Sequence, residues 1–343
     1  MRAQASNWAR KSQRFAGLPA LAQGATQPLA DPARWLTPQT GVLTEQLLRE
    51  SALSAEQGGE QWLDGSFTHR GRTLAYKLFL PPQTAASTLR PMTVMLHGCT
   101  QDAADFAAGT QMNAQARALG MVVLYPEQSQ RDNPRKCWNW FHTQHQQRGR
   151  GEPAVLAALT ESIAAEHRVD RARIFVAGLS AGGAMADILG ATYPEVFAAV
   201  GVHSGLPRGC ATDVMSALAA MRSGCPAPAR SAGPAPATIV FHGDADQTVH
   251  ISNGPALIEA ALQARGMQGS QAQPSEGQSA QGQRYSQTVY HDSEGHAMAE
   301  YWQLHGAGHT WSGGHRDGSY TDPAGVDATA QMLRFFLAHP KAG

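Results

Sequence analysis

One stretch constrains the fold more than any other: an apolar run, a glycine-flanked serine and a helix-compatible segment follow one another directly. The apolar run covers 174–177, the pentapeptide Gly-Leu-Ser-Ala-Gly covers 178–182, and the helix-compatible segment covers 184–193. In such a strand–turn–helix the serine adopts strained backbone angles and points its hydroxyl outward, while side chains on the two glycines would collide with the strand and the helix. The pattern therefore predicts an elbow-like turn with Ser180 as a nucleophile.

The composition is that of an ordinary globular protein. The chain has 343 residues, of which 42% are hydrophobic and 16% are charged, enough for one large core. No apolar run approaches the roughly 18 residues that a transmembrane helix needs, so we expect no membrane span. Lys plus Arg and Asp plus Glu both number 27, and no basic tract carries interleaved aromatics, so we expect no nucleic-acid partner.

Apolar strand-like segments alternate with helix-compatible segments along most of the chain. Strands are expected at 92–96, 121–125, 174–177, 197–202 and 238–242, and helices at 111–119, 153–167, 184–193 and 326–338. Strands separated by helices predict an α/β fold with a mainly parallel central sheet and helices on both faces. A hairpin at 65–80 predicts an antiparallel N-terminal edge of that sheet.

The chain is expected to divide into an N-terminal arm and one catalytic domain. Residues 1–60 are rich in Ala, Gln and Pro, which predicts a partly disordered arm. Gly17 and Pro19 interrupt its short apolar run, so it lacks the unbroken core of a signal peptide. Residues 61–343 are expected to form the single domain, in which the Gln-, Ser- and Gly-dense segment 267–287 is a flexible surface insertion.

The candidate nucleophile needs a base to take its proton and an acid to orient that base. After a nucleophile elbow these partners follow the serine in the order Asp or Glu, then His. Asp246 is favoured over Asp244, because it lies beyond a strand end and its loop returns to the core at Val249. His309 is favoured over His305, because it sits in a Gly-rich loop, whereas His305 is close to the last strand. These two complete a candidate catalytic triad.

The negatively charged oxygen that develops during acyl transfer needs two preorganised backbone donors. One candidate is the N–H of Ala181, directly after the nucleophile. The other is the N–H of Cys99, in the loop that follows the strand at 92–96. None of the four cysteines forms a C-x-x-C metal pattern. We expect neither a metal nor an organic cofactor.

Taken together, these motifs resemble the polyhydroxybutyrate (PHB) depolymerase family of esterases, which has the α/β-hydrolase fold. The resemblance spans about 65–338 and rests on Leu-His-Gly-Cys-Thr-Gln at 96–101, Cys-Trp-Asn-Trp at 137–140, Gly-Leu-Ser-Ala-Gly-Gly at 178–183, Val-His-Ser-Gly-Leu at 202–206, Phe-His-Gly-Asp-Ala-Asp-Gln-Thr-Val-His at 241–250 and Gly-Ala-Gly-His-Thr-Trp-Ser-Gly-Gly at 306–314. It implies that Ser180, Asp246 and His309 form the triad, with Cys99 at the oxyanion loop.

The resemblance also implies an activity. It is that of a serine esterase, a carboxylic-ester hydrolase, which cleaves poly(3-hydroxybutyrate) or short-chain hydroxyalkanoate oligomers through an acyl-enzyme. The family includes, more distantly, feruloyl and acetylxylan esterases, so a feruloyl or acetylxylan-type carboxylesterase of the same fold is the alternative. The expected partner is a polyester or oligoester substrate, found at a granule surface in the polymer case.

Aromatic side chains would bury the methyl and methylene groups of an aliphatic polyester. Trp311 is the first candidate for such a groove, because it lies two positions after His309. Trp138 and Trp140 are candidates for the same groove, with a place in the core or a lid as the alternative. Ser204 is a further candidate for substrate contact.

The redox state of the four cysteines would indicate the cellular compartment. We consider two disulfides, Cys99 with Cys137 beside the oxyanion loop and Cys210 with Cys225 around a helix-like segment. Four free thiols are the alternative and would suit a cytoplasmic protein. Secreted members of the family carry a signal peptide, and many carry a polymer-binding domain; neither is recognised here. We therefore expect a cytoplasmic, granule-associated protein, with a secreted or periplasmic location as the alternative if the cysteines are bridged.

Overall fold

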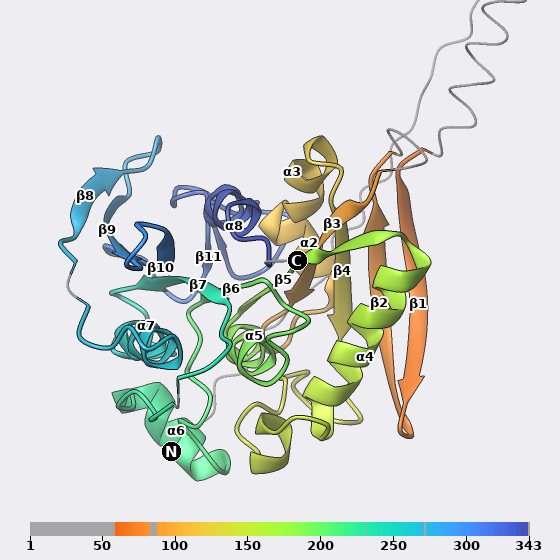
Figure 1. The fold of residues 1–343 in the computed structure, drawn as a ribbon, viewed down its shortest axis with the longest axis horizontal. Coiled ribbons are helices and arrows are strands. Elements are labelled where there is room, and N and C mark those ends of the chain that lie inside the picture. Colours follow the sequence, from red (N-terminus) through yellow and green to blue (C-terminus); the bar gives the residue numbers. More distant parts are fainter. Residues whose placement is uncertain (1–58, 83–87, 231, 271, 342–343) are drawn as a thin grey trace, which may run out of the picture. The chain divides into compact units, whose positions relative to one another are not determined.

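The computed structural model describes residues 59–82, 88–230, 232–270 and 272–341 (Figure 1). The N-terminal arm expected at 1–60 lies outside the described residues, apart from its last two positions. The described residues belong to one compact unit built around a large sheet.

Ten strands form this sheet in the order β1-β2-β4-β3-β5-β6-β7-β10-β9-β8. Their bounds are β1 Gln61–His69, β2 Arg72–Leu80, β3 Arg90–Leu96, β4 Val122–Glu127, β5 Val169–Leu179, β6 Ala199–His203, β7 Ala237–Gly243, β8 Ser275–Gln278, β9 Arg284–His291 and β10 Ala297–Leu304. The strands from β4 to β10 in this order pair in parallel. The hairpin β1–β2 at one edge and β8–β9 at the other are antiparallel. The expected mainly parallel sheet with an antiparallel N-terminal edge is confirmed.

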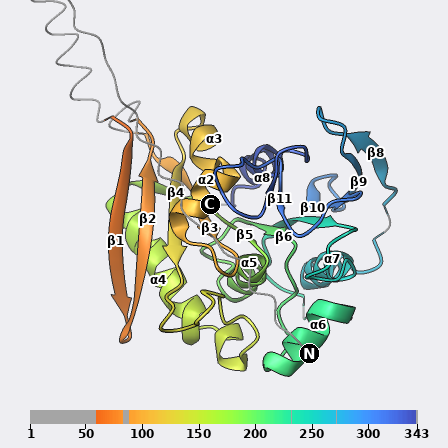
Figure 2. The same ribbon diagram turned by 180° about the vertical axis from the view of Figure 1, so that it is seen from behind.

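Helices cover both faces of the sheet (Figures 1 and 2). Their bounds are α2 Ala103–Thr110, α3 Met112–Ala118, α4 Gly151–Glu166, α5 Ala181–Thr192, α6 Val214–Ser223, α7 Asn253–Ala264 and α8 Ala328–Leu337, with a 3-10 turn η2 at Thr143–Gln146. Buried residues of α4, α5 and α7 form one core cluster with the sheet. Buried residues of α2, α3 and α8 form the other. The predicted helical layers on both faces are therefore present.

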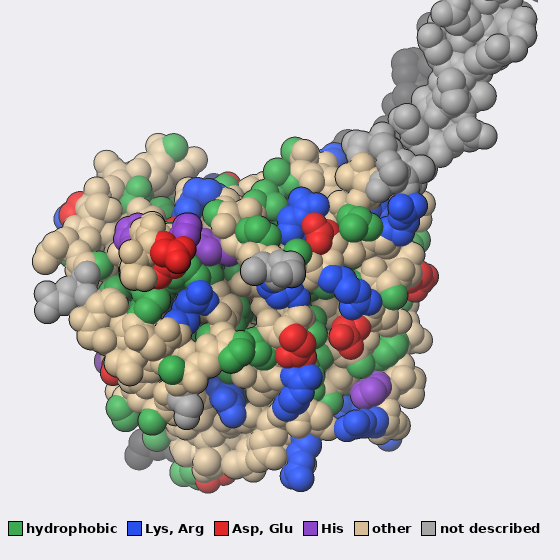
Figure 3. Space-filling view, viewed as in Figure 1, with side chains coloured by type: hydrophobic (Ala, Val, Ile, Leu, Met, Phe, Trp, Pro, Cys, Tyr) green, Lys and Arg blue, Asp and Glu red, His purple; other side chains and the backbone are tan. Residues whose placement is uncertain are grey.

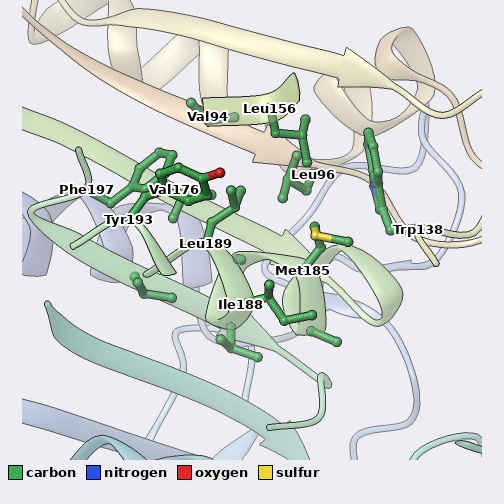
Figure 4. Packing of buried hydrophobic residues seen from close by; sticks show 14 of the residues in the cluster. Val94, Leu96, Trp138, Leu156, Val176, Met185, Ile188, Leu189, Tyr193 and Phe197 are labelled. Atoms are coloured by element: carbon green, nitrogen blue, oxygen red, sulfur yellow. The ribbon is translucent and has the colours of Figure 1, made fainter. Parts of the chain in front are cut away.

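Neighbouring residues of the central strands pack on opposite faces. On β3, Val94 belongs to the cluster of α4 and α5, whereas Met95 belongs to the cluster of α2 and α8. Both side chains are fully buried. Figure 4 shows the first cluster, in which Leu156 of α4 and Leu189 of α5 pack with Val94. Because both faces are covered, these strands have continuous apolar sequences, and this made them recognisable without the structure.

The segment 267–287, where we predicted a flexible surface insertion, contains a strand. Strand β8 lies inside this segment and pairs antiparallel with β9, so the segment extends the sheet edge. Its sequence, Ser-Glu-Gly-Gln, is largely exposed and has no apolar alternation. A strand that buries neither face lacks the periodic signal from which strands are predicted, so the polar composition did not reveal β8.

Charged side chains of both signs lie on the face of the described residues that Figure 3 shows. On the face shown in Figure 3, Lys and Arg side chains are interspersed with Asp and Glu. This agrees with the equal numbers of basic and acidic residues, 27 of each, in the sequence. None of the helices in the described ranges combines the length and the apolar composition that a membrane crossing requires.

The burial of Leu189 predicts that a cavity at this position lowers the stability of the fold. Leu189 of α5 is 0% exposed, so Leu189→Ala should lower the free energy of unfolding by about 2–5 kcal/mol, because the site collapses only partly. Urea unfolding followed by circular dichroism measures this. Leu119→Ala, at a side chain that is 41% exposed, is the control and should change stability by less than about 0.5 kcal/mol. Equal effects at both positions would contradict the assignment.

Candidate active site

Ser180 stands between the end of β5 and the start of α5, at φ 57° and ψ −119°. A positive φ is uncommon for a residue with a side chain, and such strain concentrates at functional sites. The N–H of Ser180 donates to the carbonyl of His203 on β6 (2.8 Å), and its own carbonyl accepts from the N–H of Ala184 (2.9 Å). Backbone hydrogen bonds on both sides therefore hold the strained turn in place.

The two glycines of the elbow let backbone segments touch. A Cβ on Gly182 would lie 2.0 Å from the carbonyl oxygen of Leu96 and 2.6 Å from that of His97. A Cβ on Gly178 would lie 2.4 Å from the carbonyl carbon of Gly182. These distances are far below van der Waals contact, so the end of β3 packs on the first turn of α5 only because side chains are absent there.

Asp246 and His309 face each other from two neighbouring loops. Asp246 follows β7 and His309 follows β10, and these strands are adjacent and parallel. Asp246 Oδ2 lies 2.7 Å from His309 Nδ1, which leaves Nε2 of the imidazole to act as a base. The two loops also touch through their backbones, because a Cβ on Gly243 would lie 2.2 Å from the carbonyl oxygen of Ala307. The structure thus brings together the expected acid and base.

The carboxylate of Asp246 is fully buried and tightly held. Its Oδ1 accepts from the N–H groups of Thr248 (2.8 Å) and Val249 (2.9 Å). Burial by itself raises the pKa of Asp246, but the hydrogen bond and the charge interaction with His309, together with the two N–H donors, lower that pKa overall. Asp246 is therefore ionised at neutral pH and orients the Nδ1–H of His309.

His203, at the end of β6, links the serine turn to the loop that carries the candidate base. Its carbonyl accepts from Ser180, and its ring Nε2 accepts from the N–H of Ser312 (3.1 Å). Because Nε2 accepts, Nδ1 carries the proton and donates to Ser204 Oγ (3.1 Å). Burial, reinforced by positive charge on neighbouring histidines, lowers the pKa of His203 to about 3. The imidazole is therefore neutral near pH 7, and His203 forms a hydrogen-bonded bridge between the two segments.

The loop after β3 lies beside Ser180, the candidate nucleophile. A Cβ on Gly98 would be 3.7 Å from the Cβ of Ser180, and the N–H of Gly98 donates to Oε1 of Gln101 (2.9 Å). Within the described ranges, neither the N–H of Cys99 nor that of Ala181 donates to a protein acceptor. Both are free to donate to a bound oxygen, as an oxyanion hole requires. Their role in binding that oxygen stays a prediction.

Gln101 ends the motif at 96–101, but we predicted no role for it. It is 2% exposed, and its amide Nε2 donates to Asp105 Oδ2 (3.0 Å) and to the carbonyl of Ser319 (3.1 Å). Its Oε1 meanwhile accepts from the N–H of Gly98 and so holds the loop in which the N–H of Cys99 comes next. Its partner Ser319 is distant in the sequence, so the motif at 96–101 could not reveal this contact.

Both disulfides that we considered are present, Cys99–Cys137 and Cys210–Cys225. All four cysteines are bridged, so the alternative of four free thiols is not what the structure contains. The first bridge ties the oxyanion loop to the Trp-rich loop at 137–141. The second closes a loop that includes α6.

A buried carboxylate that we did not predict organises the Trp-rich loop. Glu152, at the start of α4, is 0% exposed and accepts from the N–H (2.7 Å) and the side-chain amide (2.6 Å) of Asn139, and from Gln128 (2.6 Å). Burial raises the pKa of Glu152, but the interaction with His145 and the hydrogen bonds from Asn139 lower it overall. The ionised Glu152 thus holds the Trp-rich loop, to which the disulfide links Cys99.

The side chains expected to contact substrate are buried instead. Exposure is 0% for Trp138 and Ser204, 1% for Trp311 and 5% for Trp140. The short strand β11 (Trp311–Ser312) pairs with β12 (Thr321–Asp322). It turns the indole of Trp311 toward α8, where Nε1 donates to Thr329 Oγ1 (3.1 Å), and onto the ring of Phe106 in α2. Trp138 and Trp140 thus lie in the core, the alternative given for them, and Trp311 packs in the core as well. Contact of these residues or of Ser204 with substrate stays a prediction.

The two candidates that we did not favour, Asp244 and His305, form a pair of their own. Asp244 Oδ2 lies 2.8 Å from His305 Nδ1, so each histidine has its own carboxylate. This pairing agrees with the choice of Asp246 for His309. In the described part of the chain, no group of three or more His, Cys, Asp or Glu side chains is arranged to hold a metal ion.

The parallel sheet, the serine elbow after its central strand and the acid and base after later strands define an α/β-hydrolase fold. The structure is similar to that of the acetyl xylan esterase from Aspergillus awamori, with a TM-score of 0.65 at 18% identity, over 82% of this chain and 100% of that chain. A likeness at this identity supports the fold alone. The predicted fold class is confirmed.

The chain belongs to the Esterase PHB depolymerase family, whose sequence model matches residues 74–280. It is 34% identical over 231 residues to the poly(3-hydroxyalkanoate) depolymerase C of Paucimonas lemoignei, which is 64% of this chain and 54% of that protein. It is 31% identical over 141 residues to the feruloyl esterase B of Thermothelomyces thermophilus, which is 41% of this chain and 47% of that protein. The chain thus spans about half the length of these curated relatives. The predicted family is confirmed.

The close packing of Gly182 on the backbone of Leu96 predicts that one added methyl group lowers both stability and activity. Gly182→Ala would place a Cβ 2.0 Å from the carbonyl oxygen of Leu96, so β3 and α5 must separate. We expect a loss of about 1–3 kcal/mol in unfolding free energy, as for an overpacked core, and at least a tenfold fall in the rate of ester hydrolysis. Gly233→Ala, where a Cβ meets nothing within 4 Å, is the control. Wild-type rates in Gly182→Ala would contradict the packing.

The ionised Asp246 predicts a specific pH dependence. Asp246→Asn should lower kcat about 10⁴-fold, because an amide no longer holds the imidazole in the productive tautomer. Since the folded-state pKa of Asp246 is lowered, its stabilisation of the fold is present above the ordinary Asp range and is lost as the pH falls through the lowered pKa. Urea unfolding from pH 7 to pH 3 should therefore show a larger loss of stability in the wild type than in Asp246→Asn. Equal losses would refute the ionised state.

Proposed function

We propose that this protein is a serine esterase that hydrolyses the ester bonds of poly(3-hydroxybutyrate) or of short-chain hydroxyalkanoate oligomers. The observation that carries the proposal is the partly buried Asp246–His309 pair, with 2.7 Å between Oδ2 and Nδ1, which follows the carboxyl ends of parallel strands of the same sheet in which Ser180 follows β5 in a strained elbow. Membership of the Esterase PHB depolymerase family supports the reaction class. The 34% identity to a poly(3-hydroxyalkanoate) depolymerase supports the polyester substrate.

The reaction proceeds through an acyl-enzyme. Ser180 Oγ attacks the ester carbonyl carbon while Nε2 of His309 takes the serine proton. The N–H groups of Cys99 and Ala181 donate to the negatively charged oxygen of the tetrahedral intermediate. The His309 imidazolium, stabilised by Asp246, then protonates the leaving 3-hydroxyl oxygen as the ester C–O bond breaks.

Deacylation repeats the same chemistry with water. His309 takes a proton from a water molecule, which attacks the acyl carbon, and the imidazolium returns the proton to Ser180 Oγ as the hydroxyacid leaves. Every proton in the cycle moves through one imidazole. The mechanism requires no metal or organic cofactor.

A feruloyl or acetylxylan-type carboxylesterase is the second candidate function. It would use the same three residues, and a relative named feruloyl esterase B is 31% identical to this chain over 141 residues. Trp138, Trp140 and Trp311 are buried, so their exposure favours neither substrate class. Substrate profiling therefore distinguishes the two candidates.

The two disulfides support a location in an oxidising compartment, the periplasm or the extracellular space. We propose this location, our original alternative, in place of the cytoplasmic one, because cytosolic reductants keep most thiols reduced. The polymer would then be met outside the cytoplasm rather than on an intracellular granule.

The proposed substrate is tested by incubating the protein with emulsified amorphous poly(3-hydroxybutyrate) and following the release of 3-hydroxybutyrate and its oligomers. Parallel reactions contain methyl hydroxycinnamates and acetylated xylan, and Ser180→Ala is the control. We expect release from the polymer by the wild type and none by Ser180→Ala. No release, with rapid turnover of the hydroxycinnamates, would replace the polyester assignment with the second candidate.

A further inference from the structure

One aromatic side chain for which we predicted no role is bonded to the candidate site. Trp62 and Tyr320, which are 40% and 45% exposed, are the exposed aromatic residues of the described ranges. Trp62 lies on β1, at the edge of the sheet. Tyr320 directly precedes β12, and its carbonyl accepts from the N–H of Trp311 (2.7 Å). Because Trp311 comes two positions after His309, Tyr320 is bonded to the segment that carries the candidate base.

The hydroxyl of Tyr320 reaches the oxyanion loop. It lies 3.2 Å from Thr100 Oγ1, and Thr100 directly follows Cys99. Thr100 donates its own hydroxyl hydrogen to the carbonyl of Cys99 (2.5 Å), so Tyr320 is the donor in the bond to Thr100. The backbone of Tyr320 is thus held by the histidine segment, and its side chain is held by the oxyanion loop.

The backbone on both sides of this contact is strained. Tyr320 has φ 52° and Thr100 has φ 67°, a left-handed conformation that is uncommon for residues with a side chain. Hydrogen bonds of Ser319 hold Tyr320 in place: the N–H of Ser319 donates to Asp105 Oδ1 (2.8 Å), and its carbonyl accepts from Gln101 Nε2 (3.1 Å). Strained residues that the surrounding structure fixes in this way concentrate at functional sites.

The ring of Tyr320 is suited to contact with aliphatic groups. Its hydroxyl already has a protein partner in Thr100, so the apolar ring is the part that is available to a ligand. An aromatic ring offers a large apolar area for such a contact. Trp138, Trp140 and Trp311 are 5% exposed or less, whereas Tyr320 offers exposed aromatic surface next to the oxyanion loop.

A bound ester must extend past the segments that Tyr320 connects. In the proposed mechanism the carbonyl carbon lies at Ser180 Oγ, and the carbonyl oxygen lies at the N–H groups of Cys99 and Ala181. The ester bond then stands between the oxyanion loop and His309. Groups attached to that bond leave it along the surfaces of these segments, where the ring of Tyr320 is exposed.

We propose that Tyr320 is a specificity-determining residue whose ring contacts the methyl and methylene groups beside the scissile ester bond. The inference rests on the proposed function, which gives Ser180, His309 and the oxyanion loop their roles, and it names a residue that selects an aliphatic ester. If Tyr320 only joined two loops through its hydroxyl, its loss would affect all esters alike.

The test compares an ester that has many aliphatic groups with one that has few. Kinetics are measured on the methyl ester of the 3-hydroxybutyrate trimer and on methyl acetate. Tyr320→Ala should raise KM for the trimer about tenfold, the scale of a lost methylene contact. It should leave kcat within about twofold, because the contact is present in both the bound ester and the transition state. For methyl acetate, kcat/KM should change by less than about twofold.

Two further variants separate the ring from the hydroxyl and the site from the rest of the surface. Tyr320→Phe keeps the ring, so its KM for the trimer should stay within about twofold of the wild type. The matched control is Trp62→Ala, which removes an aromatic side chain of similar exposure from β1 and should reproduce wild-type kinetics. The proposal is overturned if Tyr320→Ala leaves KM for the trimer unchanged, if it lowers kcat/KM equally for both esters, or if Tyr320→Phe loses as much as Tyr320→Ala.

Equilibrium binding reads the contact without any turnover. Isothermal titration calorimetry measures the Kd of the trimer for Ser180→Ala and for the double variant Ser180→Ala/Tyr320→Ala, and we expect a Kd about tenfold higher for the double variant. Equal Kd values, or no binding to Ser180→Ala, would overturn the proposal. A wild type that hydrolyses no trimer, together with the tenfold difference in Kd, would instead refute the proposed function and leave the contact of Tyr320 standing.

Discussion

The contact between the end of β3 and the first turn of α5 is the constraint on which the rest of the site depends. It exists because Gly182 has no side chain where a Cβ would lie 2.0 Å from the carbonyl oxygen of Leu96. This contact places the loop after β3 against Ser180, so that the N–H groups of Cys99 and Ala181 lie near the nucleophile without protein acceptors of their own in the described residues. Hydrogen bonds from Gln101 and the disulfide to Cys137 then hold that loop.

Three imidazoles at or after the ends of the strands β6 and β10 have different surroundings. His203 is buried without a paired carboxylate, and its lowered pKa, about 3, keeps it neutral as a structural hydrogen-bonding group. His309 has one buried carboxylate, which orients it and leaves Nε2 free. His305 lies between Asp244, 2.8 Å from its Nδ1, and Ser286, 2.7 Å from its Nε2. One residue type thus serves as a structural hydrogen-bonding group, as the proposed base and as a contact between loop and sheet edge.

The features predictable from the sequence were those that depend on local pattern. Apolar runs covered on both faces indicated the parallel strands, and the glycines with the chain order indicated the serine turn and its partners. Contacts between distant segments were not predictable in this way. Trp311 was expected in a groove because it follows His309, but pairing of β11 turns it into the core. Gln101 and His305 form hydrogen bonds with residues on other loops and strands. Strand β8 has no apolar alternation.

The central claim, that Ser180 is the activated nucleophile of this arrangement, is tested most directly by covalent labelling. Intact-mass and peptide mass spectrometry after reaction with a fluorophosphonate should show one phosphonyl group per chain, on the peptide that contains Ser180. Ser180→Ala should take up none, and His309→Ala should react far more slowly because the base is missing. Stoichiometric labelling that persists in Ser180→Ala, or that maps to another residue, would contradict the account.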